Sequence, residues 1–82
     1  MTRETILERA TQIIADVLGV DKECVCEVSE FERDFGADSL DAVDLIRVFE
    51  KEFQISIDDD DSSKVETVGD AVDMVERLMK QS

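Results

Sequence analysis

The sequence lacks several residue types, and each absence excludes a kind of chemistry. There is no histidine, proline, tryptophan or tyrosine among the 82 residues, and only two cysteines are present. Without histidine, no serine in the chain has the usual partner that activates it as a nucleophile. Two thiols without histidine cannot fill a four-ligand zinc site within one chain. We therefore expect a chain that is not an enzyme and that holds no metal.

The two cysteines, Cys24 and Cys26, also argue against a secreted protein. Their one-residue spacing does not match a C-x-x-C redox motif, and we expect two small, semi-buried thiols in a reducing compartment. Charged residues such as Arg3 and Glu4 interrupt any signal-like apolar run. No segment is apolar and long enough for a membrane span. A cytoplasmic location is expected, with mitochondrion or plastid as alternatives if a targeting segment has been removed.

Positive charge is scarce. Nine lysines and arginines oppose 22 acidic residues, which gives a formal net charge of −13 at pH 7. A field of this sign repels nucleic acid and anionic membranes, so neither is an expected partner. It favours proteins with basic patches. Like charge also discourages self-association, so we expect a monomer.

The spacing of apolar residues predicts an all-α fold. They recur at helical intervals in segments 3–18, 39–53 and 68–80, and a short helical turn is expected over 59–65. No segment alternates in the manner of a strand. The expected architecture is a small four-helix bundle, with three main helices, a short third helix and a long first loop. With 43% hydrophobic residues, the chain can form one core, and its length predicts a single domain, 1–82.

Polar and glycine residues mark the ends of these helices. Thr2 and Asp38 are expected N-caps, and Gly19 is placed to end the first helix. Thr67 and Asp70 resemble a capping box with a shorter acid than usual. The helix starts are therefore better defined by the sequence than the loops between them.

Residues 20–38 show no sustained periodicity, and we expect a long ordered loop held by dispersed apolar side chains. Loops of this length are uncommon in small domains and tend to be functional. The helix that follows is expected to direct one stripe of side chains inward, made of Val43, Ile46, Phe49 and Phe53 with Leu45 beside it.

Asp58 to Asp61 is a run of four carboxylates that could attract hard cations. An EF-hand loop needs glycine at its sixth position and glutamate at its twelfth. Counted from Asp58, these positions hold Ser63 and Gly69, so the match fails. A solvated acidic turn is the expected reading.

Ser39 is the most informative residue of the chain. It lies in the stretch from Gly36 to Asp41, where an acidic loop becomes a helix. The first backbone N–H groups of a helix have no partner within it, and the helix dipole is positive at that end. Both would hold a phosphate attached to the serine. We therefore interpret Ser39 as an attachment point, and the alternative is an ordinary serine at a helix start.

Three segments resemble the acyl carrier proteins of the fatty-acid-synthesis type. The stretch from Phe35 to Leu45 is similar to the family's signature around its modified serine. Residues 50–57 resemble the exit of its second helix, and residues 67–72 resemble the start of its last helix. These matches occur in the family's order and spacing and extend over nearly the whole chain.

The resemblance implies a carrier mechanism. A phosphopantetheinyl transferase would attach 4′-phosphopantetheine covalently to Ser39, and acyl groups would be carried as thioesters on its terminal thiol. Asp38 would position the attachment site, and Leu40 would pack near the arm. The chain would deliver its acyl groups to fatty-acid-synthesis enzymes with basic docking patches.

Two further sets of residues are expected to serve this role. Partner docking is assigned to residues on the second helix and at its start: Asp38, Asp41, Val43, Asp44 and Arg47. Acyl chains are expected to be sheltered in a pocket near Phe31, Phe35, Phe49, Ile57, Val65, Ala71 and Val72; the alternative is that these residues form a closed core.

Arg47 departs from the resemblance, because the family commonly has methionine at this place. A cation here would weaken the local negative field, or it would form a weak surface pair with a neighbouring carboxylate. Two other functions remain open from the sequence. One is a carrier in another pathway, such as polyketide, peptide, aminoacyl or specialised lipid synthesis; the other is an acidic helical module that binds a basic protein.

Overall fold

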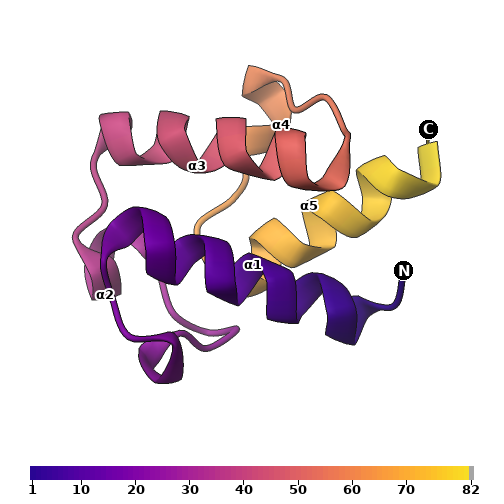
Figure 1. Ribbon diagram of the computed structural model, residues 1–82. Helices are drawn as coiled ribbons and strands as arrows, with labels where there is room; N and C mark the ends of the chain where they lie inside the picture. Colours follow the sequence, from indigo (N-terminus) through magenta and orange to yellow (C-terminus); the bar gives the residue numbers. More distant parts are fainter. Residues whose placement is uncertain (82) are drawn as a thin grey trace.

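The computed structural model describes residues 1–81, and within them the fold is all-α (Figure 1). The three long helices are α1 (Arg3–Leu18), α3 (Ser39–Phe53) and α5 (Val68–Gln81). Helix α1 packs against both α3 and α5. The expected bundle is thereby confirmed, and α4 (Asp59–Ser63) is its short additional helix.

The first loop contains more structure than the sequence predicts. A 3₁₀ turn, η1, spans Lys22–Cys24, and a five-residue helix, α2, spans Phe31–Phe35. Gly36 ends α2 with φ of 65°, a left-handed conformation that glycine adopts without steric cost. The ordered loop expected over 20–38 thus contains two short elements that the sequence did not predict, because both are shorter than the window in which periodicity is visible.

The expected caps of the long helices are present. The Thr2 side chain accepts a hydrogen bond from the Thr5 N–H, and Gly19 ends α1 in the left-handed region. Before α5, the Thr67 Oγ1 accepts from the Asp70 N–H at 3.1 Å, while the Asp70 carboxylate accepts from the Thr67 N–H at 3.2 Å. This reciprocal pair is the capping box expected at residues 67–70.

The core lies where the three long helices meet. Ile14 of α1 and both Val72 and Val75 of α5 are completely buried, and Phe49 of α3 packs against this group. Phe49 and Phe53 are stacked, with 6.0 Å between ring centroids. Burial of these apolar faces is the main force that holds the bundle together.

The first loop is fastened to the start of α5 by backbone hydrogen bonds. The Phe31 N–H donates to the Glu66 carbonyl at 3.0 Å, and the Val68 N–H donates to the Ser29 carbonyl at 3.0 Å. The Gly69 N–H donates to the Glu27 carbonyl at 2.8 Å. We call this contact between residues 27–31 and 66–69 the backbone seam; it holds α2 beside α5 although the two helices are far apart in sequence.

Some apolar and sulfur side chains lie further out than the sequence suggests. Cys24 and Cys26 are exposed rather than semi-buried, and Val28 is 83% exposed. Val43 is 44% exposed and does not belong to the inward stripe of α3, whereas Leu45 is buried. The stripe is rotated from the predicted one because α3 packs on Leu45, Phe49 and Phe53.

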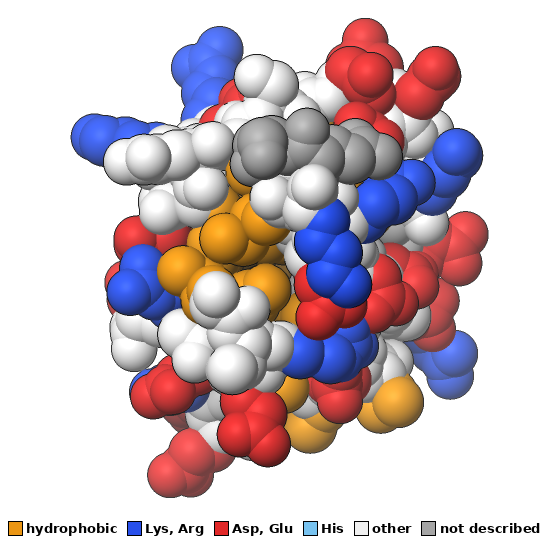
Figure 2. Space-filling view, turned by 90° about the vertical axis from the view of Figure 1, so that its right-hand side faces the viewer, with side chains coloured by type: hydrophobic (Ala, Val, Ile, Leu, Met, Phe, Trp, Pro, Cys, Tyr) orange, Lys and Arg blue, Asp and Glu red, His pale blue; other side chains and the backbone are white. Residues whose placement is uncertain are grey.

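Charged side chains cover the outside of the bundle. Figure 2 shows the face at which both chain ends lie, where acidic and basic side chains surround an apolar patch. Arg3 links three elements, since its guanidinium pairs with Glu27 of the first loop and with Asp73 and Glu76 of α5. Hydrogen bonds to Asp73 and Glu27 raise the pKa of Arg3 above its ordinary value. Within residues 1–81, no helix combines the length and apolar character that a membrane crossing requires.

Candidate functional site

Ser39 is the first residue of α3 and is exposed. A reciprocal capping box fixes the helix start around it. The Asp38 Oδ1 accepts from the Asp41 N–H at 3.0 Å, and the Asp41 Oδ2 accepts from the Asp38 N–H at 3.2 Å. The two carboxylates therefore hold the backbone on both sides of Ser39, while its hydroxyl faces the surface.

The start of α3 suits a phosphate ester. In the part of the chain that is described, the backbone N–H groups of Ser39 and Leu40 have no hydrogen-bond acceptor. They lie at the positive end of the dipole of a 15-residue helix. A phosphodiester on the Ser39 Oγ would find donors and favourable charge there, so these residues fit 4′-phosphopantetheine.

The segment before Ser39 is held by local backbone bonds. The Gly36 N–H donates to the Glu32 carbonyl at 3.1 Å, and the Ala37 N–H donates to the Phe31 carbonyl at 3.0 Å. These bonds close α2 only two residues before the cap of α3. The position of Ser39 relative to α2 is therefore defined by the backbone.

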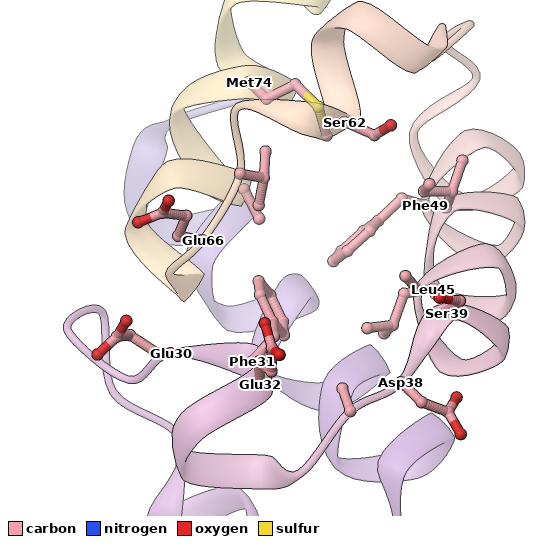
Figure 3. A pocket seen from close by; sticks show the side chains of 15 residues that line it. Glu30, Phe31, Glu32, Asp38, Ser39, Leu45, Phe49, Ser62, Glu66 and Met74 are labelled. Atoms are coloured by element: carbon pink, nitrogen blue, oxygen red, sulfur yellow. The ribbon is translucent and has the colours of Figure 1, made fainter.

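A cavity of about 680 Å³ lies beside Ser39. Figure 3 shows Phe49 and Leu45 projecting into it from α3 and Phe31 from α2, with Met74 of α5 on the opposite side. Ser39 itself lies on the rim. Apolar rings and aliphatic chains at the centre, with carboxylates such as Glu30 and Glu66 at the edge, make this a space for an apolar group.

Four residues of the expected acyl pocket line this cavity: Phe31, Phe49, Val65 and Ala71. The other three lie elsewhere. Val72 is completely buried in the core, and Ile57 packs against the core from the connector before α4. Phe35 lines a separate hollow formed with the first loop. Neighbouring residues of a helix face different sides of it. The sequence alone did not show which of these residues face the cavity.

The sequence missed several lining residues, namely Ala42, Leu45, Ile46 and Met74. Leu45 and Ile46 carried a usable signal, because both are apolar and flank Phe49 on the inner side of α3. Met74 carried less, since Val68, Val72 and Val75 of the same helix are completely buried in the core.

Helix α4 forms part of the cavity rim through Ser62. Its cap is Asp58, whose carboxylate accepts from the Asp61 N–H at 2.8 Å. This hydrogen bond, helped by the positive charge of Arg77, lowers the pKa of Asp58 below its ordinary value of 3.8. Arg77 also pairs with Asp61 at 2.7 Å, which ties α4 to α5. In residues 1–81, no three His, Cys, Asp or Glu side chains are grouped so that they could hold a metal ion.

The outer face of α3 contains the expected docking residues. Leu40 and Val43 are 75% and 44% exposed, so they offer apolar contact area on this face. Asp38, Asp44 and Arg47 are also exposed, and Asp41 is half-buried by its capping role. Along α3 from Ser39, the acidic and apolar docking residues precede Arg47.

The fold and this site define a class of protein: a small helical module with an exposed serine at a helix start, next to an apolar cavity. A family model described as "Phosphopantetheine attachment site" matches residues 8–75. The chain belongs to the acyl carrier protein family, whose members are in general non-catalytic carriers.

Two solved structures are similar along nearly the whole chain. An acyl carrier protein from Thermotoga maritima has a TM-score of 0.83 and 33% identity, covering 99% of this chain and 94% of that one. An acyl carrier protein from Enterococcus faecalis has a TM-score of 0.79 and 33% identity, covering 95% of this chain and 99% of that one. The family implies a phosphopantetheine attachment site and interaction with modifying and acyl-transfer enzymes.

Proposed function

We propose that this protein carries acyl chains for fatty-acid synthesis on a 4′-phosphopantetheine arm attached to Ser39. The arm supplies a thiol that holds each acyl group as a thioester. The observation that carries the proposal is Ser39 at the capped start of α3, exposed and next to donors without acceptors. Ser39 offers the hydroxyl oxygen, and the cap keeps that oxygen at the surface.

Asp38 acts as a positioning residue in this proposal, because its carboxylate fixes the first turn of α3. Leu40 is exposed one residue beyond Ser39 and offers an apolar contact beside the arm. The phosphopantetheinyl transferase would recognise this turn, and enzymes with basic patches would meet the carboxylates of Asp38, Asp41 and Asp44. Rim charges of this kind favour fast and transient binding.

Mass spectrometry tests the attachment directly. The intact chain is incubated with coenzyme A and a phosphopantetheinyl transferase, and the expected result is a mass gain of one phosphopantetheine group. Ser39→Ala should show no gain, and Ser56→Ala is the matched control that should gain the full mass. A mass gain on another residue, or none with an active transferase, would overturn the proposal.

The cavity beside Ser39 supports sequestration of the acyl chain. It is lined by Phe31, Leu45 and Phe49, and it opens beside the attachment serine. Loading a long acyl group should shift the nuclear magnetic resonance signals of Phe49 and Ala71, which line it. Signals of Ile14, in the closed core, should move little. Shifts confined to the arm would count against sequestration.

The pathway is tested by partner enzymes. Under this proposal, fatty-acid-synthesis enzymes accept the loaded chain with a higher kcat/KM than enzymes of polyketide, peptide, aminoacyl or specialised lipid pathways. The family now favours a carrier over an unmodified protein-binding module. We further propose that the protein is a monomer, because its charge of −13 opposes self-association, and sedimentation checks this. We also propose that it acts in the cytoplasm, which cell fractionation checks.

A further inference from the structure

Arg47 is an exposed arginine on the outer face of α3 that forms no ion pair within the described residues. Arg3, Arg9, Arg33 and Arg77 each form an ion pair with a carboxylate of this chain. Arg47 alone among the arginines pairs with no carboxylate within the described residues, although the chain has 22 acidic residues. It is exposed on the helix that begins with Ser39.

Three acidic residues of α3 make other contacts, whereas Asp44, three residues before Arg47, forms no ion pair with it within the described residues. Glu50, three residues later, accepts a hydrogen bond from the Ile57 N–H at 2.8 Å. Glu52 pairs with Arg9 of α1 at 3.3 Å. Asp41 accepts from the Asp38 N–H. Arg47 lies six residues before the end of α3, outside the last turn where the helix dipole favours a cation. Neither an ion pair nor the dipole explains its charge at this position.

Helical geometry places Arg47 in the middle of the docking face. Leu40 and Arg47 are seven residues apart, almost two full turns, so their side chains point in nearly the same direction. Asp44 and Lys51 lie three and four residues from Arg47 and belong to the same stripe. The buried side of α3, at Phe49, lies on the opposite side of the helix.

The exposed stripe of α3 is therefore divided by charge. Its first half, from Asp38 to Asp44, is acidic and includes the apolar Leu40 and Val43. Its second half has two cations, Arg47 and Lys51. Arg47 lies about 12 Å along the helix axis from Ser39, at a rise of 1.5 Å per residue. A uniformly basic partner surface would suit the first half and repel the second.

We propose that Arg47 is a specificity-determining residue that binds a carboxylate on the docking face of the acyl-transfer enzyme. This enzyme would present cations to Asp38 and Asp44, an apolar contact to Leu40, and an aspartate or glutamate to Arg47. The planar guanidinium can bind a carboxylate through two parallel hydrogen bonds, which fixes the register as well as the partner. The proposal rests on the proposed function, because it assumes that loaded chains dock through α3.

Charge-reversal variants test this inference. Arg47→Glu and the control Arg33→Glu change the net charge equally, and Arg33 is an 80% exposed arginine on α2. Both are loaded with phosphopantetheine, and kcat/KM for acyl transfer is measured with an acyl-transfer enzyme from the same organism. Arg47→Glu should lose about tenfold or more, chiefly through KM, as expected for a lost charge pair at an interface. Arg33→Glu should stay within about twofold of the parent.

A chemical cross-link identifies the partner group. Arg47→Lys keeps the charge and gives an amine, which a zero-length carbodiimide couples only to a carboxylate in contact. The expected product joins position 47 to an aspartate or glutamate of the acyl-transfer enzyme. Cross-links at other lysines of this chain but none at position 47 would overturn the inference. So would equal kinetics for Arg47→Glu and Arg33→Glu, after circular dichroism has shown that both are folded.

Two further outcomes can be distinguished from the kinetic and cross-linking results described above. A cross-link from position 47 to Asp44 of a second copy, with a dimer in sedimentation, would make a second copy the occupant and overturn the assignment to an enzyme. Failure of the parent chain to gain phosphopantetheine would instead refute the proposed function. The mass measurement precedes the kinetic one, so the two failures cannot be confused.

Discussion

The two sides of this small bundle are built differently. The pair α1 and α5 meets in a closed core, in which Ile14 and Val72 have no exposed surface. On the other side, α2 and α4 have five residues each and no buried ones, and with α3 they surround a cavity. Stability is concentrated in the closed side, which leaves the open side free to form the space beside Ser39. The following experiments test this division.

The largest expected effect is on the closed side. Ile14→Ala should lower the free energy of unfolding by about 3 kcal/mol, because it leaves a void in a packed core. That is a large part of the roughly 5 to 8 kcal/mol available to a chain of this size. Urea denaturation followed by circular dichroism measures it. The control Ile57→Ala, at a half-buried site of the open side, should cost about 1 kcal/mol. Equal losses would contradict the division.

The next effect concerns the start of α3. Asp38→Ala should cost about 1 kcal/mol, since it removes the acceptor for the Asp41 N–H. Asp44→Ala removes the same charge from the same helix without removing a cap. It should leave stability unchanged or raise it slightly by relieving repulsion. Thermal unfolding of the two variants at equal ionic strength compares them, and similar losses would show that charge rather than the cap matters.

Salt affects the whole molecule. With 22 acidic and 9 basic residues, repulsion outweighs the exposed ion pairs, so NaCl or Mg²⁺ should raise the melting temperature. A gain of about 1 kcal/mol corresponds to roughly 5 °C in a chain of this length. Arg3→Gln should be less stable than the parent at low salt, with the gap narrowing at high salt. An unchanged melting temperature would show that repulsion is already balanced.

The smallest effect is on the open side at low pH. The pKa of Asp58 is lowered in the folded state, so its carboxylate adds stability above the ordinary value of 3.8. That contribution is lost as the pH falls through the folded pKa. Asp58→Asn should therefore be slightly less stable than the parent at pH 7, and the difference should begin to shrink as the pH falls below about 4 and disappear only below the folded pKa. A constant difference from pH 7 to pH 3 would assign the effect to the cap geometry.

The sequence predicted the parts that depend on local contacts. The caps at Thr2 and Asp38 and the stop at Gly19 depend on neighbouring residues, and all three are present. Ser39 was also placed correctly at the start of α3. These features need no knowledge of distant segments, because a cap and its helix lie in one stretch of chain.

Features that depend on distant segments were not predicted. Helix α2 has only five residues, and its first N–H is bound by the carbonyl of Glu66. No pattern within residues 20–38 reveals such a partner. The side of α3 that faces the core was also predicted incorrectly, by part of a turn about the helix axis. The prediction placed Val43 inward and Leu45 beside the inward stripe. Which of several apolar residues faces a cavity depends on packing against other helices.

The backbone seam has a consequence for how this protein can diverge among lineages. Its hydrogen bonds join main-chain atoms, so its exposed side chains, such as that of Val28, can change without breaking them. Selection should remove two kinds of substitution. Proline at Phe31, Val68 or Gly69 would delete a hydrogen-bond donor. A larger residue at Gly69 would place its Cβ 3.1 Å from the Glu27 carbonyl oxygen. Exposed positions of the seam can therefore vary among lineages while its main-chain hydrogen bonds keep α2 against the start of α5.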